Sequence, residues 1–205
     1  IYLLIDRRPK KDSFVNTDIL IVGGGLSGLA LADHLTRAGR DHLLIEAQER
    51  LGGRILSPQV MGARFDLGPA WFWPDQPRIA ALAQRFDIPV FEQYAEGDLM
   101  LEGPTGAVQR RSGFAPMQGS YRLHGGMLAM IDALAGCLEP EHILTGTRLE
   151  TLHRGNDGIT VRLDQGGTPL TIRAKQIVLA VPPRVLADTV SFDPPLDAAQ
   201  LGVLS

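Results

Sequence analysis

The sequence predicts an α/β fold, and three observations point to it. Residues 18–46 have the pattern of a buried strand, a glycine-rich turn, a helix and a second buried strand. Such a unit is a βαβ crossover, which joins parallel strands. Residues 147–174 alternate as three strands separated by short turns, and an apolar strand follows at 176–181. Together these features predict a large α/β domain that contains a β-meander.

The opening unit follows from hydrophobic periodicity. Residues 19–22 are continuously aliphatic, as expected of a strand buried on both faces. Apolar residues then recur at helical spacing over 26–35, and Gly39 ends that helix. The run "HLLIEA" predicts a second buried strand at 42–46.

Caps and turn residues predict the remaining elements. Asp75 or Gln76 caps a helix that has Pro77 in its first turn and runs to about Phe86. The stretch "DLMLEGPTGAVQ" predicts a hairpin whose turn contains two glycines. A further helix, apolar on one face, is expected at 126–138. The meander strands are expected at 147–154, 158–165 and 169–174, separate from a last strand at 176–181 that ends at Pro182-Pro183.

Composition excludes several classes of function. The 205 residues carry a net charge of −3, which gives nucleic-acid binding no electrostatic support. The single cysteine, Cys137, excludes an internal disulfide and a cysteine-clustered metal site, and the five histidines lack metal-ligand spacing. No apolar run approaches the roughly 20 residues of a membrane-spanning helix. We therefore expect a cytoplasmic protein without a metal, a nucleic-acid partner or a membrane partner.

The first 17 residues form a leader of unusual composition. They begin without Met and place a short apolar run before a basic cluster, which reverses the order of a secretory signal. We expect residues 1–17 to be disordered or non-native.

Three glycines between the first strand and the helix have the G-x-G-x-x-G spacing. Gly23 would allow the tight turn, Gly25 would let a pyrophosphate approach the backbone, and Gly28 would let helix and strand pack closely. The N–H groups and dipole of the helix N-terminus would then attract phosphates. Alone, the pattern is equally typical of a structural glycine turn.

An acid and a second glycine pair favour nucleotide binding. Glu46 ends the second strand 18 residues after Gly28, near the spacing of a carboxylate that binds ribose hydroxyls. The alternative is a solvated carboxylate at a strand end. Gly52-Gly53-Arg54 adds flexible backbone and a cation that can pair with a pyrophosphate, although a surface arginine in a turn is possible.

These residues carry a family resemblance. The stretch "DILIVGGGLSGLALADHLTRAGRDHLLIEAQERLGGRI" closely resembles the opening of flavin-containing amine oxidases. "RFDLGPAWFW" resembles the D-x-G-x-x-W segment of that family, and "YRLHGGMLAMIDALA" its Arg-x-x-Gly-Gly-Met entry into a helix. "IVLAVPPRVL" resembles its returning strand. The four blocks occur in family order from about residue 18 to 200.

The resemblance implies an FAD/NAD(P)-binding, Rossmann-like three-layer domain of the glutathione-reductase type, with a partial substrate-domain insertion. Residues 18–75 and 122–200 would form the FAD-binding domain and 76–121 the insertion, with the C-terminal half of the family absent. It also implies cofactor-binding roles. The ADP part of FAD would contact Gly23, Gly25, Leu26, Ser27, Gly28, Glu46 and Ala47. The pyrophosphate and the flavin would contact Gly52, Gly53 and Arg54, and the flavin ring would also contact Gly68, Pro69, Ala70 and Trp71. The adenine would contact Arg148.

The implied activity is oxidation of an amine to an imine by FAD, with O₂ reduced to H₂O₂. The catalytic residues are unknown, and a homodimer or a completing second chain is a possible partner. The alternatives are a truncated, non-catalytic FAD-binding remnant and a flavoenzyme similar to protoporphyrinogen oxidase or a desaturase. The glycines and Glu46 alone would also fit an NAD dehydrogenase, but "LGGR" and "DLGPAW" argue against it. Trp71 and Trp73 fit either an aromatic wall over the substrate or a core corner.

Overall fold

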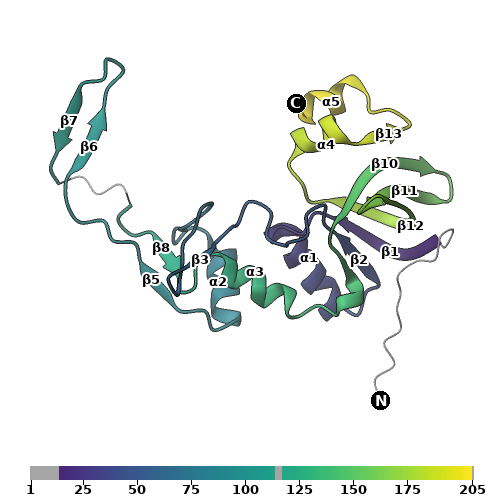
Figure 1. The fold of residues 1–205 in the computed structure, drawn as a ribbon, viewed down its shortest axis with the longest axis horizontal. Coiled ribbons are helices and arrows are strands. Elements are labelled where there is room, and N and C mark those ends of the chain that lie inside the picture. The colour runs from purple at the N-terminus through teal and green to yellow at the C-terminus, as the bar shows by residue number, and fades with distance from the viewer. Residues whose placement is uncertain (1–13, 114–116, 205) are drawn as a thin grey trace. The chain divides into compact units, whose positions relative to one another are not determined.

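The computed structural model describes residues 14–113 and 117–204 (Figure 1). The chain divides into a first unit, Ile1–Arg54 with Ile131–Ser205, and a second unit, Ile55–Met130. The expected insertion at 76–121 lies within the second unit, which begins earlier and ends later. The last four residues assigned to the leader belong to a strand, so the expectation of disorder is wrong for them. The rest of the leader lies outside the described residues.

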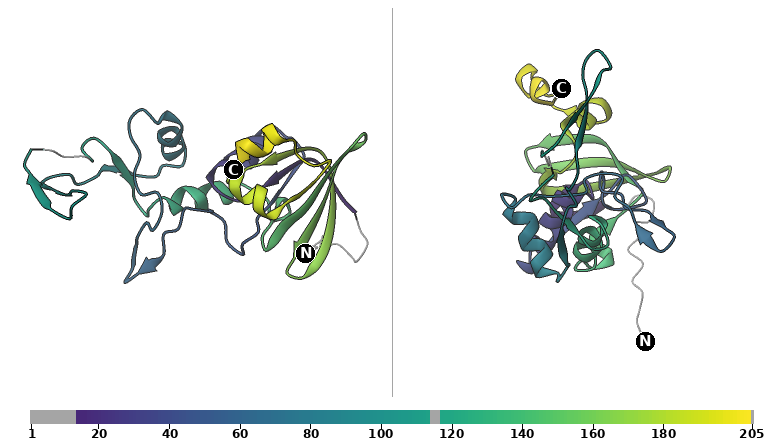
Figure 2. Two further views of the ribbon diagram at one scale, coloured as in Figure 1. Left: turned by 90° about the horizontal axis from the view of Figure 1, so that it is seen from above. Right: turned by 90° about the vertical axis from the view of Figure 1, so that its left-hand side faces the viewer.

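The first unit contains a seven-stranded sheet. The strands on one side of the sheet pair in parallel, whereas the three meander strands are antiparallel to one another. Figure 2 shows the meander strands, green to yellow, beside the purple first strand. The order in the sheet is β13 (Ser191–Asp193), β10 (Thr147–Gly155), β11 (Gly158–Gln165), β12 (Thr168–Leu179), β1 (Phe14–Val22), β2 (His42–Ile45) and β9 (Ile143–Leu144).

The predicted βαβ unit is confirmed. Strand β1 pairs with β2 in parallel, and helix α1 (Leu26–Arg37) joins them. All four residues at 19–22 are buried, as are all four residues of β2. Apolar packing on both faces explains why these strands have continuous rather than alternating hydrophobicity. Strand β1 begins at Phe14, earlier than expected, because its first residues pair with β12.

One predicted boundary in the meander is wrong. We expected a turn at Lys175 between two strands, but β12 is a single strand from Thr168 to Leu179. Its first half pairs antiparallel with β11, while the segment from Thr171 onward pairs in parallel with β1. The strand is long because it belongs to the meander and to the parallel sheet at once. Lys175 Nζ lies 2.6 Å from Asp18 Oδ1 of β1.

A buried apolar cluster supports the sheet. It takes residues from β1 and β2 and from all three meander strands, so the two halves of the sheet share one core. Its fully inaccessible members include Leu20, Ile45, Val161, Leu163 and Ile172.

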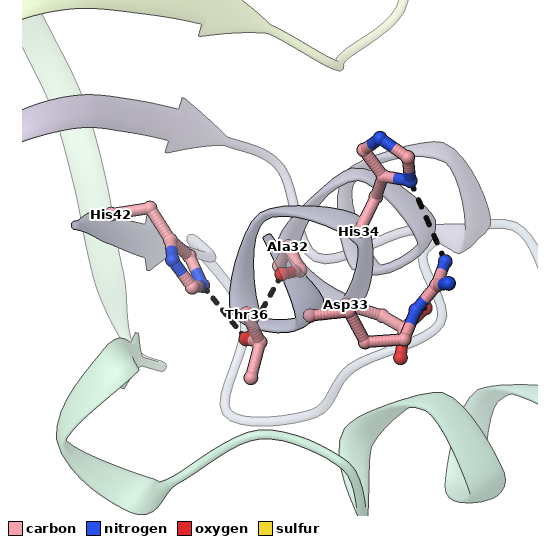
Figure 3. A network of polar contacts seen from close by, with 6 residues as sticks. Ala32, Asp33, His34, Thr36 and His42 are labelled. Atoms are coloured by element: carbon pink, nitrogen blue, oxygen red, sulfur yellow. Dashed lines mark hydrogen bonds and ion pairs between the residues drawn. The ribbon is translucent and has the colours of Figure 1, made fainter. Parts of the chain in front are cut away.

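A polar network anchors the end of α1 to the start of β2 (Figure 3). The His42 side chain is buried, with Nδ1 2.9 Å from the Arg40 carbonyl oxygen and Nε2 3.5 Å from Thr36 Oγ1. The Thr36 hydroxyl donates to the Ala32 carbonyl at 3.1 Å. Arg37 Nε donates to buried Asp33 at 3.2 Å on the same helix. These contacts hold α1 at the end away from the glycine turn.

Short elements make up the second unit. The predicted hairpin is confirmed as β6 (Leu99–Glu102) and β7 (Val108–Arg111), and Gly106 N–H donates to Gly103 O at 2.9 Å in its turn. The predicted helix is confirmed as α2, which starts at Pro77 after the N-cap Gln76. The other elements are β3 (Gln59–Val60), β4 (Ala63–Arg64), α2 (Pro77–Arg85), β5 (Val90–Glu92) and β8 (Tyr121–Leu123).

The helix expected at 126–138 is shorter than predicted. Helix α3 comprises Leu128–Ala135, and the boundary between the two units falls within it. Gly125 and Gly126 precede it with φ angles of +78° and +72°, outside the right-handed helical region. The first unit also contains η1 (Pro140–His142), α4 (Pro183–Thr189) and α5 (Ala198–Leu204).

Candidate nucleotide-binding site

At two positions of the turn between β1 and α1, there is no room for a side chain, so only glycine fits. Gly23 has a φ of +111°, and a Cβ on it would lie 2.7 Å from the Ala180 carbonyl oxygen. Its N–H donates to the Ile45 carbonyl of β2 at 2.8 Å. A Cβ on Gly28 would lie 1.9 Å from the Gly23 carbonyl oxygen. Gly28 therefore allows the close packing of helix and turn that its position in the motif predicts.

Gly25 differs from its neighbours because the protein's own packing does not require it. A Cβ built there meets no atom of residues 14–113 and 117–204 within 4 Å, and its φ of −77° is accessible to any residue. Gly25 is the N-cap of α1, with no side chain to bond the first N–H groups of the helix. Leu26 is half-buried and Ser27 exposed at this end. The backbone here is open to a ligand, and an anion is the ligand it favours.

Glu46 lies against this turn. Its carboxylate is buried, with Oε2 accepting from Gly24 N–H at 2.7 Å and Oε1 accepting from Gln48 N–H at 2.8 Å. The alternative of a solvated carboxylate at a strand end is therefore wrong. Ala47, the next residue, is exposed. The carboxylate is fixed by two backbone donors beside the glycine turn.

The second glycine pair packs on the first. Gly52 N–H donates to Gly24 O at 2.8 Å, and Gly25 and Gly52 form a parallel bridge. A Cβ on Gly53 would lie 3.4 Å from Gly25 Cα. Glycines on both segments let the two backbones approach each other next to the N-terminus of α1. Arg54, which follows, is exposed.

Sequence reasoning missed Arg50. Its guanidinium is half-buried, with Nη2 donating to Gly53 O at 2.9 Å and Nη1 to Leu51 O at 3.3 Å. These bonds brace the loop that carries the second glycine pair. A cation just before two glycines was the available signal, because the backbone carbonyls of a tight glycine loop need donors.

Arg148 lies on a strand that begins beside Glu46. Gly146 N–H donates to Gln48 O at 2.9 Å, and Thr147 N–H donates to Glu46 O at 2.8 Å. Arg148 is the next residue, exposed on β10 and opposite Asp164 on β11. The first unit thus places Arg148 near the predicted ribose acid, although the two are about 100 residues apart in sequence.

The remaining predicted residues belong to the second unit. Gly68, Pro69 and Trp71 are exposed and Ala70 is half-buried. Phe72, which follows, is buried and exchanges backbone hydrogen bonds with Tyr121. Because side chains alternate along an extended segment, the neighbouring tryptophans point away from that core.

Trp71 and Trp73 form an exposed aromatic pair. Their ring centroids are 6.5 Å apart, the rings are nearly perpendicular, and the residues are 44% and 37% exposed. Within the second unit, the interpretation as a core corner is therefore wrong. Their exposure is compatible with the aromatic wall that was the other interpretation.

Other features lie apart from the predicted residues. A concavity of about 660 Å³ at the amino end of β1 is lined by Asp18, Asp41, His153 and Lys175, among others, and by none of the predicted site residues. Within residues 14–113 and 117–204, no group of histidine, cysteine and acidic side chains has the arrangement of a metal site. Among the described helices, none is long and apolar enough to cross a membrane.

Two family models match the chain. One, described as an NAD(P)-binding Rossmann-like domain, matches residues 21–86. The other, described as a flavin-containing amine oxidoreductase, matches residues 96–202, slightly more than half of the chain. The Rossmann-like prediction and the family resemblance are thereby confirmed.

Individual relatives agree with the family models. Putrescine oxidase from Kocuria rosea is 24% identical over 92% of this chain and 61% of its own length. Probable flavin-containing monoamine oxidase A from Dictyostelium discoideum is 32% identical over 60% of this chain and 28% of its own length. A structure of putrescine oxidase bound to putrescine superposes with a TM-score of 0.78 at 21% identity, covering 94% of this chain and 64% of that one. This last likeness concerns the fold.

The chain covers only part of the length of these relatives, and some of the difference lies inside the aligned region. It spans about three fifths of the length of the putrescine oxidase. The alignment runs over 294 positions although this chain has 205 residues, so the relative has residues within the matched span that this chain lacks. The glycine turn, the buried acid and the family model over 96–202 lead to one conclusion. The chain belongs to the family of flavin-containing amine oxidoreductases.

Proposed function

We propose that the first unit binds the ADP part of FAD. The observation that carries this proposal is the open backbone at Gly25, where no atom of the described residues lies within 4 Å of an added Cβ and which adjoins a helix N-terminus without a side-chain cap. The pyrophosphate would lie against the N–H groups of Leu26, Ser27 and Gly28, where an anion gains most from the helix dipole. The backbone at Gly52 would approach it from the other side.

Glu46 would select the nucleotide. A ribose hydroxyl can donate to the remaining lone pairs of a carboxylate that already accepts two backbone N–H groups. A 2′-phosphate would bring like charges together at this position and is therefore disfavoured. Arg148, on the strand that begins beside Glu46, would lie at the adenine.

The proposed reaction is oxidation of an amine. The chemistry that bound FAD would supply is a two-electron oxidation. The carbon next to a neutral amine would lose a hydride equivalent and the nitrogen a proton, leaving an imine, and O₂ would take up the two electrons and two protons as H₂O₂. The segment from Gly68 to Trp71 would line the flavin ring and orient it, and the exposed aromatic pair would exclude water from the substrate. We assign no side chain of this chain as a general acid or general base in the reaction.

A second candidate is FAD binding without turnover. One observation favours it: within the aligned region, putrescine oxidase has residues that this chain lacks. Such residues would belong to the substrate pocket if they fall in the insertion, while the nucleotide-binding turn would stay intact.

The test is reconstitution of the purified chain with FAD, followed by its visible absorbance and by H₂O₂ release with a panel of mono- and diamines. Flavin absorbance that stays with the protein through gel filtration, together with amine-dependent peroxide, is the expected result. Bound flavin without peroxide would support the second candidate. Retention of NAD⁺ in place of FAD would overturn both.

A further inference from the structure

Asp66 is the buried carboxylate of the second unit, and it begins the segment that leads to Trp71. Its side chain is only 2% exposed. By contrast, the residues that follow are mostly exposed, and Leu67 is 69% accessible. An aspartate is seldom buried unless its charge is paired and its oxygens are hydrogen-bonded.

Both oxygens of this carboxylate have partners. Oδ1 accepts from Ser57 Oγ at 2.5 Å and from Met127 N–H at 2.9 Å, while Oδ2 lies 3.4 Å from Arg122 Nη2. Ser57 Oγ in turn accepts from Leu128 N–H at 3.3 Å. We call Ser57, Asp66, Arg122, Met127 and Leu128 the Asp66 cluster. It supplies the beginning of α3 with the two acceptors that its own residues do not provide.

The glycine turn before α3 is shaped to admit this carboxylate. A Cβ on Gly126 would lie 2.6 Å from Asp66 Oδ1, and the residue has a φ of +72°. Gly126 is therefore required both by its backbone conformation and by the approach of the carboxylate. The cluster joins the two stretches "RFDLGPAW" and "YRLHGGM", which contain Asp66 and Arg122.

The exposed segment between Asp66 and Phe72 is held at both ends. Asp66 fixes its start to the beginning of α3, and Phe72 fixes its end through two backbone hydrogen bonds with Tyr121, at 2.9 and 2.7 Å. Residues 67–71 therefore have a defined path without being packed into a core of the second unit. An exposed apolar segment whose course is fixed in this way is suited to present its backbone and side chains to a ligand.

We propose that Asp66 is a positioning residue, which holds residues 67–71 in the conformation that contacts the flavin ring. This inference rests on the proposed function, because that function places Gly68 to Trp71 at the ring. Asp66 itself would not touch the cofactor. Its charge and its hydrogen bonds would act through the backbone that follows it.

The experiment compares two ligands on the Asp66→Asn variant of the full chain. ADP lacks the flavin ring and reports only on the site at Gly25 and Glu46, whereas FAD reports on both. We expect the Kd of ADP to change less than about twofold and the Kd of FAD to rise about tenfold, since an amide cannot satisfy both the N–H donors and Arg122. The visible spectrum of the bound flavin should shift towards that of free FAD.

Two further variants separate positioning from general damage. Asp98→Asn removes a carboxylate that pairs with Arg110 in the same unit but at an exposed hairpin, and should change neither Kd. Arg122→Lys keeps the positive charge and should give a smaller rise in the Kd of FAD than Arg122→Gln. If Asp66→Asn fails to fold, Ser57→Ala removes one bond to the carboxylate and should shift the flavin spectrum in the same direction.

The outcomes distinguish this inference from the proposed function. A wild-type chain that binds neither ADP nor FAD would overturn the proposed function, and the inference with it. A wild-type chain that binds both, with an unchanged FAD-to-ADP affinity ratio and flavin spectrum in Asp66→Asn, would overturn the inference alone. Equal weakening of ADP and FAD would also overturn it, because Asp66 would then act only on stability.

Discussion

The two units hold their predicted site residues in different ways. In the first unit the site is backbone packed on backbone: Gly52 N–H bonds Gly24 O, and Gly28 has no room for a side chain. In the second unit the predicted residues are exposed except for half-buried Ala70, and one buried carboxylate, Asp66, fixes the start of their segment.

This difference has a physical origin. A pyrophosphate would be bound by backbone N–H groups, which every residue except proline has, so the proposed first site depends on close approach and on glycine. A flavin ring needs a shaped surface, so the proposed role of the second segment would depend on how side chains fix the backbone beneath it. Substitutions should therefore act through sterics in the first unit and through loss of polar or apolar anchors in the second.

The largest effect is expected at Gly28. Gly28→Ala puts a methyl group 1.9 Å from the Gly23 carbonyl oxygen, and we expect a loss of about 5 kcal/mol or an unfolded first unit. The matched variant is Gly25→Ala, whose Cβ meets no atom within 4 Å. Its free energy of unfolding should differ from the wild type by less than about 1 kcal/mol, because the lower entropy of the unfolded chain opposes the preference for glycine over alanine at an N-cap, but it should bind ADP more weakly. Urea unfolding and calorimetric titration with ADP measure the two effects. Equal stability of the two variants would contradict the steric account.

The next effect is expected at Phe72, the apolar anchor in the second unit. Phe72→Ala should lower the free energy of unfolding by about 3 kcal/mol, because the ring is 2% exposed. Trp71→Ala changes the neighbouring residue, which is 44% exposed, and should cost less than about 1 kcal/mol. Thermal unfolding of the pair tests this order. A greater loss from Trp71→Ala would mean that the tryptophan is packed in solution.

Glu46 should combine a moderate stability effect with a binding effect. Glu46→Gln replaces one carboxylate oxygen with an NH₂ group, which cannot accept from a backbone N–H, at a cost of about 2 kcal/mol. Affinity for ADP should fall about tenfold, because a hydrogen bond to a charged acceptor is lost. Exposed Glu49 lies three residues away, and Glu49→Gln is the control that should leave ADP binding unchanged. Denaturant unfolding and titration with ADP provide the readouts, and an unaltered ADP affinity in Glu46→Gln would refute the ribose assignment.

The smallest effect is expected at Arg50. Arg50→Met keeps the length of the side chain but removes its donors to Leu51 O and Gly53 O, which should cost about 1 kcal/mol. Amide hydrogen exchange at Gly52 and Gly53 should accelerate, because the loop opens more often. Arg40→Met, at an exposed arginine, should leave both quantities at wild-type values. Unchanged exchange in Arg50→Met would show that the glycine pair needs no brace.

Local patterns predicted most of the first unit. The spacing of three glycines and the aliphatic runs on either side identified β1, the turn, α1 and β2, because each of these depends on residues close in sequence. The same reasoning failed at Lys175, where we expected a turn between two separate strands. Strand β12 continues there because it has partners on both sides, β11 and β1, and partners are not visible in a local pattern.

The sequence by itself determined that a glycine turn, an acid and a second glycine pair occur in the order of a nucleotide-binding unit. Sterics and chain order impose that much, whatever the rest of the molecule does. Only the tertiary structure brought Asp66 to Met127, 61 residues away, and turned the Glu46 carboxylate onto Gly24. Such contacts depend on which buried donors and acceptors find each other when the chain is packed, and spacing in the sequence does not encode that choice.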